Sequence, residues 1–348
     1  MAATASTAAA NYRLASRRRG LFLSLLFASV LALLAVDLAM GPAQIGWAAL
    51  WTYFADPAAA SATLHTIVWQ LRLPQALMAV LVGAALGVAG AEMQTVLNNP
   101  LASPFTLGVS SAAALGAAIT LIFDWQPSFI PARYVLAFNA FILAFLCSVL
   151  LDAVARRARV GMAGIVLFGI ALVFTFNALL SLVQLTANAG ALQDLVFWMM
   201  GSLQRSDWPG VGLMTIALVL VLPFSISNAW RLTALRFGDD RAASFGVDPR
   251  KVRRASLIRV SILASLAVAL VGIIGFIGLI APHIARRLWG EDHRWYLPAS
   301  ACIGSAILIA ASVVAKLLSS NAVIPVGIVT TLVGIPFFVM ALMRGSLQ

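Results

Sequence analysis

The sequence is short of charged residues and of the side chains that usually carry chemistry. Only 10% of its 348 residues are Asp, Glu, Lys or Arg, whereas 62% are hydrophobic. It has two cysteines, Cys147 and Cys302, each inside an apolar run, so no disulfide framework is indicated. Its three histidines lie far apart and lack the spacing of metal ligands. These shortages exclude a disulfide-stabilised secreted domain and give no sign of a metal centre.

Lysine is especially scarce. The only two lysines, Lys251 and Lys316, follow Arg250 and Ala315, whereas a phosphate-binding loop places its lysine after a glycine. A nucleotide site of that kind is therefore excluded. The sequence also lacks a nucleophile elbow and a pair of carboxylates placed to face each other. We expect a chain that is not itself an enzyme and binds no cofactor of its own.

Apolar runs of about 20 residues recur instead, and the mean hydropathy is +0.98. Such runs are long enough to cross the hydrocarbon core of a membrane, which is about 30 Å thick. The sequence therefore predicts an all-α polytopic membrane protein. The predicted runs are Leu21–Met40, Ile67–Val96, Leu107–Phe123, Tyr134–Val154, Met162–Leu185, Trp208–Ile226, Ala255–Leu288, Leu297–Leu318 and Ile324–Met343.

The run Ala255–Leu288 is too long for a single crossing. Its 34 residues would extend about 51 Å as one helix. Both of its flanks are basic, which requires an even number of crossings, so we predict a break at Gly272–Gly275 and ten membrane helices in all. A short amphipathic helix, Ala191–Leu203, is predicted to lie at the outer surface.

The basic residues indicate the orientation of these helices. Of the 23 Lys and Arg residues, 19 fall on one side of the ten-helix arrangement, which places both termini in the cytoplasm. Residues 1–20 form a cytoplasmic tail and residues 21–348 one transmembrane domain. The four exceptions are Arg72, Arg133, Arg205 and Lys316. Because the charges follow the loops between apolar runs, we expect lipid and not nucleic acid around this chain.

A charged segment, Gly238–Arg254, interrupts the apolar sequence with GDDRAASFGVDPRKVRR. Its residues predict two short helices. Asp239 is a candidate N-cap of the first, Gly246 suits the left-handed residue that ends it, and Asp248-Pro249 starts the second. The segment is interpreted either as a solvated basic loop that sets topology or as a docking element for a soluble partner. The local pattern favours neither.

Glu92 is an acidic residue deep inside an apolar run. Intramembrane acids are functional by default, so one hypothesis is a proton relay in a secondary transporter. The alternative is a polar lining near the cytoplasmic mouth of a pathway, because Gln94, Asn98 and Asn99 follow within one run of sequence. We favour the lining.

Six segments of the sequence occur in an order that is specific to one protein family. They are LRLP at Leu71–Pro74, GAALGVAGAEMQTVLNNPLASPFTLGVSSAAALGA at Gly83–Ala117, WMMGSL at Trp198–Leu203, FGDDRAASFGV at Phe237–Val247, GFIGLIAPHIARRLWGEDHR at Gly275–Arg294 and PVGIVTTLVGIPFF at Pro325–Phe338. Together they cover about residues 67–343. In this order they resemble the permease subunits of binding-protein-dependent ABC importers for ferric siderophores, haem and cobalamin.

The resemblance implies a type II importer permease fold with ten helices, in a bacterial inner membrane. It implies a homodimer, two ATPase subunits that bind ATP and Mg, and a periplasmic substrate-binding protein. The chain's coupling helices would lie at about residues 238–254. The residues implied in ATPase coupling are Asp239, Asp240, Arg241, Ala242, Phe245, Gly246, Val247, Asp248, Pro249 and Arg250.

The resemblance also assigns a cytoplasmic gate and an outer docking surface. The gate segment is Asn99-Pro100-Leu101-Ala102, and the turn Gly161-Met162-Ala163 would face it. At the outer side Arg72 and Lys316 would bind acidic residues of the binding protein, although both side chains would also suit snorkelling to lipid headgroups. Three positions depart from the family pattern, namely Gln75, Ser312 and Val323.

The wording NNPLASPFTLGVSSAA is most similar to the ferric-siderophore branch of the family. The function expected from the sequence is therefore that of a permease subunit that imports an iron chelate. Among iron chelates, the resemblance favours a ferric siderophore. The alternatives are haem or cobalamin import in the same family and, in a different class, a proton-coupled transporter that uses Glu92.

Overall fold

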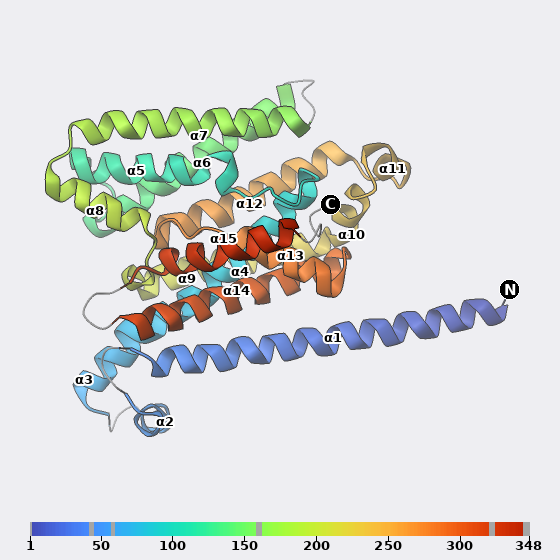
Figure 1. The fold of residues 1–348 in the computed structure, drawn as a ribbon, viewed down its shortest axis with the longest axis horizontal. Helices are drawn as coiled ribbons and strands as arrows, with labels where there is room; N and C mark the ends of the chain where they lie inside the picture. Colours follow the sequence, from blue (N-terminus) through green and yellow to red (C-terminus); the bar gives the residue numbers. More distant parts are fainter. Residues whose placement is uncertain (1, 42–44, 57–59, 158–161, 320–323, 344–348) are drawn as a thin grey trace.

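The computed structural model describes residues 2–41, 45–56, 60–157, 162–319 and 324–343, and these residues form a bundle of helices (Figure 1). Seven of the helices are long and apolar enough to cross a membrane. They are α1 (Ala2–Ala39), α4 (Leu73–Val96), α6 (Ala132–Arg157), α7 (Met162–Leu185), α9 (Trp208–Ser227), α12 (Pro249–Val271) and α14 (His293–Leu318).

Three further helices complete the predicted set but are shorter. The helices α5 (Val109–Phe123) and α15 (Val326–Met343) are apolar, and α13 (Ile277–Trp289) has 13 residues. The nine predicted runs are thus largely helical, and the predicted break in Ala255–Leu288 is confirmed. The chain leaves α12 at Gly272, whose φ of +77° lies in the left-handed region. Because α13 is too short to cross alone, the count of ten crossings stays a prediction.

The helix α1 differs most from the expectation. It begins at Ala2, so the segment predicted as an N-terminal tail is helical and continuous with the first apolar run. It packs along α14, and its first turns project past the bundle in Figure 1. Among its described side chains, Leu21, Leu25, Phe27 and Leu31 are at least half exposed, which suits a helix that faces lipid.

The helix α4 lies at the centre and packs against α12, α13 and α14 (Figure 1). Its glycines allow this close approach. A Cβ atom on Gly83 or Gly87 would overlap backbone atoms of α14, and one on Gly90 would overlap the carbonyl oxygen of Gly278 in α13. Small residues at such spacing let helix backbones touch inside a membrane, where dispersion contacts hold helices together.

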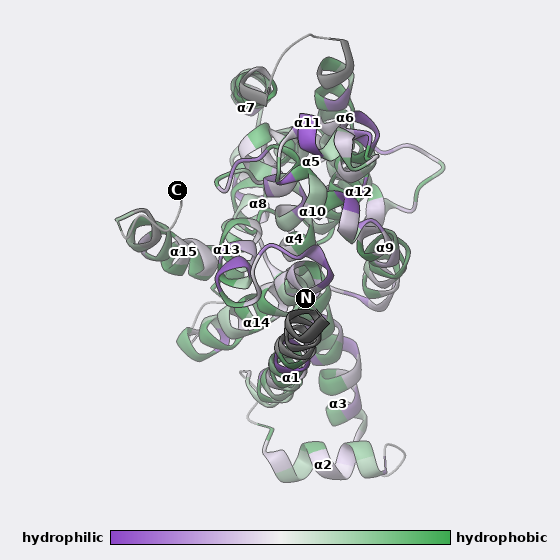
Figure 2. Cartoon of the chain, turned by 90° about the vertical axis from the view of Figure 1, so that its right-hand side faces the viewer, coloured by the Kyte–Doolittle hydropathy of each residue, from purple (hydrophilic) through white to green (hydrophobic). Residues whose placement is uncertain are grey.

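The two ends of the bundle differ in chemistry. One end, called here the basic end, carries α10 (Ala229–Leu235), α11 (Asp239–Ser244), the start of α12 and the arginines around them. Figure 2 looks at this end and shows hydrophilic residues gathered near α11 and α12. The other end, called the opposite end, carries α2 (Trp47–Ala55), α3 (Ala62–His65), a π-helical stretch (Thr66–Arg72) and α8 (Ala189–Met199).

Aromatic side chains collect at the opposite end. Trp69 and Trp208 lie with their ring centroids 4.7 Å apart, while Trp47 and Trp51 of α2 are exposed. Such residues favour the interface between hydrocarbon and water. The helix predicted at Ala191–Leu203 is present as α8, which buries Leu195 and Trp198 but exposes the apolar side chains of Val196 and Phe197. Its place at the outer surface of a membrane stays a prediction.

Candidate functional site

The charged segment at the basic end folds as one short helix, α11, followed by the first turns of α12, which is a helix of 23 residues and not the predicted second short helix. The first helix also starts differently from the prediction. Gly238 is its N-cap, with φ +93° and no side-chain cap. The prediction of Asp239 as N-cap is wrong, because its carboxylate accepts two hydrogen bonds from the guanidinium of Arg253 instead. These bonds hold the pKa of the Asp239 carboxyl below its usual value, so the pair is ionised at neutral pH.

The turn between the two helices follows the sequence pattern. Gly246 has φ +77°, as expected for the residue that ends α11. Asp248 then caps α12, since its Oδ1 accepts the backbone N–H groups of Arg250 at 3.0 Å and Lys251 at 3.2 Å. Pro249 is the first residue of α12, where its missing N–H costs nothing.

Replacing Gly246 by Val is expected to strain this turn by about 1–2 kcal/mol, because a β-branched residue resists positive φ. A Cβ atom there would meet nothing within 4 Å, so the effect comes from the backbone alone. The measurement is the free energy of unfolding in mixed detergent micelles. A matched control is Gly212→Val, which also enters open space but has no positive φ. Equal stability of both variants would contradict a strained turn at Gly246.

The surface of this element exposes aromatic rings. Trp230, Phe237 and Phe245 are each more than half exposed, and the centroid of Phe245 lies 6.4 Å from each of the other two rings. Ala242 and Val247 are buried and fix the element on the bundle, whereas Asp240, Arg241 and Arg250 are exposed. An exposed aromatic patch rimmed by charges is typical of a protein-binding surface.

The predicted gate segment forms the turn after α4, beside this element. Asn98 is exposed and adopts φ +43°. The side chain of Asn99 accepts the backbone N–H of Leu101 at 2.9 Å, which closes an Asx turn around Pro100. The segment is therefore a locally organised turn, and its role as a gate stays a prediction.

The facing part of that predicted gate is only partly described. Gly161 lies outside the described residues, and Met162 and Ala163 are the first two residues of α7.

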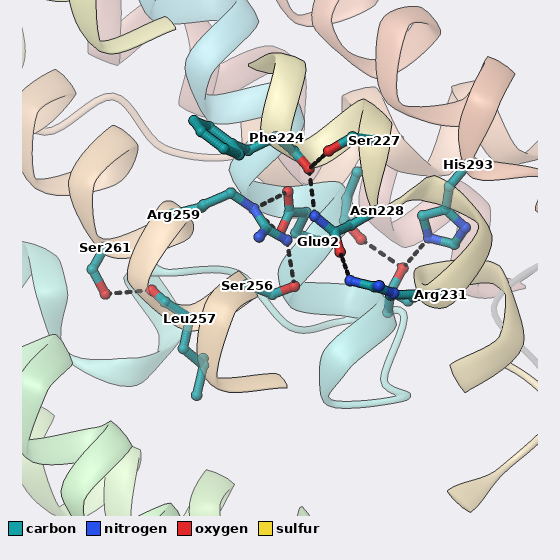
Figure 3. A network of polar contacts seen from close by, with 12 residues as sticks. Glu92, Phe224, Ser227, Asn228, Arg231, Ser256, Leu257, Arg259, Ser261 and His293 are labelled. Atoms are coloured by element: carbon teal, nitrogen blue, oxygen red, sulfur yellow. Dashed lines mark hydrogen bonds and ion pairs between the residues drawn. The ribbon is translucent and has the colours of Figure 1, made fainter. Parts of the chain in front are cut away.

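The structure buries Glu92 and Gln94 completely within the chain, and their place in a polar lining stays a prediction. Figure 3 shows Arg259 of α12 facing Glu92: its Nε and Nη2 donate to the carboxylate at 2.7–3.1 Å, and Nη2 also donates to Ser256 at 2.8 Å. Gln94 accepts a bond of 3.0 Å from Arg286. A buried carboxylate needs such a partner, and Glu92 thus serves helix packing.

Two residues in this region carry contacts that the sequence did not reveal. Arg259 falls within the predicted run Ala255–Leu288, and it lies 8% exposed inside α12. His293 is completely buried and contacts Thr95 and Thr233. A weak signal existed for Arg259, since α12 contains one arginine beyond its first turns within an apolar helix, where ionisable residues pair with one another.

At the opposite end the structure brings Arg72 and Lys316 together on the last turn of α1. Arg72 is 5% exposed and donates to the carbonyl oxygens of Leu38 at 2.8 Å and Ala39 at 3.0 Å. Lys316 donates to the carboxylate of Asp37 at 2.6 Å. Both cations therefore point into the chain and not outward to headgroups. The sequence signal for this site was Asp37, an acid within the first apolar run.

A bundle of apolar helices with a charged and aromatic surface at one end is typical of a membrane protein that binds a soluble partner. The FecCD transport family matches residues 26–344. The chain belongs to this family, whose members are permease subunits of ABC transporters.

Proteins from several organisms that are similar to this chain support its place in this family. The hemin transport system permease protein HmuU of Yersinia pestis is 34% identical over 90% of this chain and 94% of its own length. The Fe(3+)-citrate import system permease protein YfmE of Bacillus subtilis is 38% identical over 78% and 80%, and the vitamin B12 import system permease protein BtuC of Vibrio vulnificus is 36% identical over 80% and 83%. A solved metal-chelate type ABC transporter in an inward-facing conformation superposes with a TM-score of 0.81 at 27% identity, covering 93% of this chain and 99% of that one.

Proposed function

We propose that this chain is the permease subunit of an ATP-driven importer that carries a ferric siderophore from a periplasmic binding protein to the cytoplasm. Two copies would form the pathway in a bacterial inner membrane. Two separate ATPase subunits would bind ATP and Mg and dock on the basic end, one on each copy.

The observation that carries this proposal is the element formed by α10, α11 and the start of α12. It combines exposed aromatic rings with exposed charges at one end of an apolar bundle, as a docking site for a soluble protein requires. The sequence excludes a phosphate-binding loop in the chain itself. Energy from ATP therefore has to reach the permease through such a docking site.

The substrate class rests on the relatives, whose names cover haem, ferric citrate, hydroxamate-bound iron and vitamin B12. Most of these ligands are iron chelates, and the sequence around Asn98–Ala113 is most similar to the siderophore branch. The ion pair between Glu92 and Arg259 does not favour the proton-coupled alternative, because both carboxylate oxygens of Glu92 already accept hydrogen bonds from Arg259.

Docking of an acidic binding protein at Arg72 and Lys316 remains part of the proposal. Since both cations are held by the last turn of α1, the partner's carboxylates would compete with Asp37 and with the carbonyl groups of that turn.

The test is uptake into proteoliposomes that contain the permease, its ATPase and its binding protein, across ferric siderophores, haem and cobalamin. We expect a stable permease–ATPase complex and uptake of a ferric siderophore that stops when ATP hydrolysis is blocked by vanadate. Uptake that persists under vanadate and ends when the proton gradient is collapsed would overturn the proposal. Transport of haem or cobalamin alone would correct the substrate.

A further inference from the structure

The turn that follows α4 is tied to the docking element by side chains that come from three different helices. Arg253 of α12 reaches the last residue of α4, Arg236 reaches Asn98, and His293 reaches Thr95. These contacts fall on residues 95–98, directly before the Asx turn of Asn99-Pro100-Leu101. They connect the surface proposed for the ATPase with the segment predicted to close the pathway.

Arg253 makes the most direct of these connections. Its Nε donates to the carbonyl oxygen of Val96 at 3.2 Å, and its Nη1 donates to Asp239 of α11 at 2.8 Å, with a second bond from Nη2. Val96 ends α4, so its carbonyl belongs to the last turn, which has no intrahelical donor. The planar guanidinium thus joins α11 to the end of α4 through one rigid group.

The helix α11 has few other anchors. Among its described residues and the turn after it, only Ala242 and Val247 are buried, whereas the remaining positions are exposed. A displacement of α11 by a bound partner would therefore pull on Arg253 and, through its hydrogen bond, on the carbonyl group of Val96.

Arg236 and His293 hold the same turn to α10. Arg236 donates to Asn98 at 3.3 Å and also pairs with Glu291. The two ring nitrogens of His293 lie 2.7 Å from the hydroxyl of Thr95 and 3.0 Å from that of Thr233 in α10. These contacts hold the turn against α10. Of the three side chains Arg236, Arg253 and His293, it is Arg253 that also bonds to α11.

We propose that Arg253 is a positioning residue for coupling, which passes movement of α11 to the turn Asn98–Leu101 through the carbonyl of Val96. This inference rests on the proposed function, since it takes α11 as part of the ATPase docking site. The Arg253–Asp239 pair is partly exposed, with Asp239 53% and Arg253 19% accessible, so its contribution to stability is small. Its removal should impair coupling much more than folding.

The experiment follows the turn directly and needs no transported ligand. Cys147 and Cys302 are replaced by Ala, and Leu101, which is 38% exposed, is changed to Cys as a reporter. The purified permease–ATPase complex is labelled with a water-soluble maleimide, with and without ATP and vanadate. In the parent complex we expect the labelling rate to change by about tenfold on nucleotide trapping. Arg253→Lys keeps the charge but cannot hold Asp239 and Val96 together, so we expect that change to fall below about twofold, measured on the fraction of the variant complex that has trapped nucleotide.

Two further variants separate coupling from a plain ion pair. Exchanging the charges with Asp239→Arg and Arg253→Asp restores the pair but not the donor to Val96, so the nucleotide response should stay lost. Arg287→Lys is the matched control, because Arg287 is an exposed arginine on α13 outside the docking element. A full response in Arg253→Lys, rescue by the charge exchange, or no response in the parent would each overturn the inference. Failure of the parent permease to bind any ATPase would instead overturn the proposed function.

Discussion

An Arg259→Leu variant is expected to lose about 3–5 kcal/mol of folding free energy, because it leaves the buried charge of Glu92 without a partner. Glu92 is 1% exposed, and both of its carboxylate oxygens accept bonds from Arg259. The measurement is the free energy of unfolding in mixed detergent micelles, followed by the helical signal. We also expect a sharply reduced yield of folded protein.

The double variant Glu92→Leu with Arg259→Leu should recover most of that loss. Replacing both partners of a buried ion pair by apolar residues is often neutral or stabilising, whereas removal of one partner is costly. Ser256→Ala serves as the control, since it removes only a 2.8 Å hydrogen bond to Arg259 and should cost about 1 kcal/mol. A double variant as unstable as Arg259→Leu would contradict this account of the pair.

Gly90→Val is the second change with a large expected effect. Its Cβ would overlap the backbone carbonyl of Gly278, which cannot move aside as a flexible side chain would. We expect a loss of more than about 3 kcal/mol, beyond the usual range for overpacking, because α4 and α13 would have to separate. The result should be an aggregated or degraded protein in size-exclusion chromatography of the solubilised membrane.

Gly212→Val is the matched control for this prediction. Gly212 also lies inside a predicted span, but a Cβ atom there meets nothing within 4 Å. The same substitution should therefore leave the elution profile unchanged. A Gly90→Val protein that elutes like the parent would show that α4 and α13 pack less closely than the structure describes.

Much of the fold could be predicted because it follows from local chemistry. Apolar runs of spanning length became helices, and the length of Ala255–Leu288 with basic flanks was enough to predict its break. The turn at Gly246 and the cap at Asp248 also depend on neighbouring residues only. Such features need no knowledge of which helices touch.

The sequence did not reveal contacts between residues that lie far apart along the chain. Asp239 has the chemistry of an N-cap, but the guanidinium of Arg253 offers it two charged donors across the turn. Glu92 resembles a pathway residue until α12 places Arg259 against it, 167 residues later. Asp37 in the first apolar run was a signal for an internal partner of Arg72 and Lys316, but it did not show that the last turn of α1 lies beside both cations.

The pairing of Glu92 with Arg259 also sets an order for the making of the protein. Glu92 leaves the ribosome 167 residues before Arg259, a gap of about 8–33 s at the usual rate of synthesis. During that interval the carboxyl group of Glu92 has no Arg259 to bind, and an unpaired polar group in hydrocarbon is costly. The central helix can therefore complete its packing only after α12 has been made, although it is the second apolar segment to be synthesised.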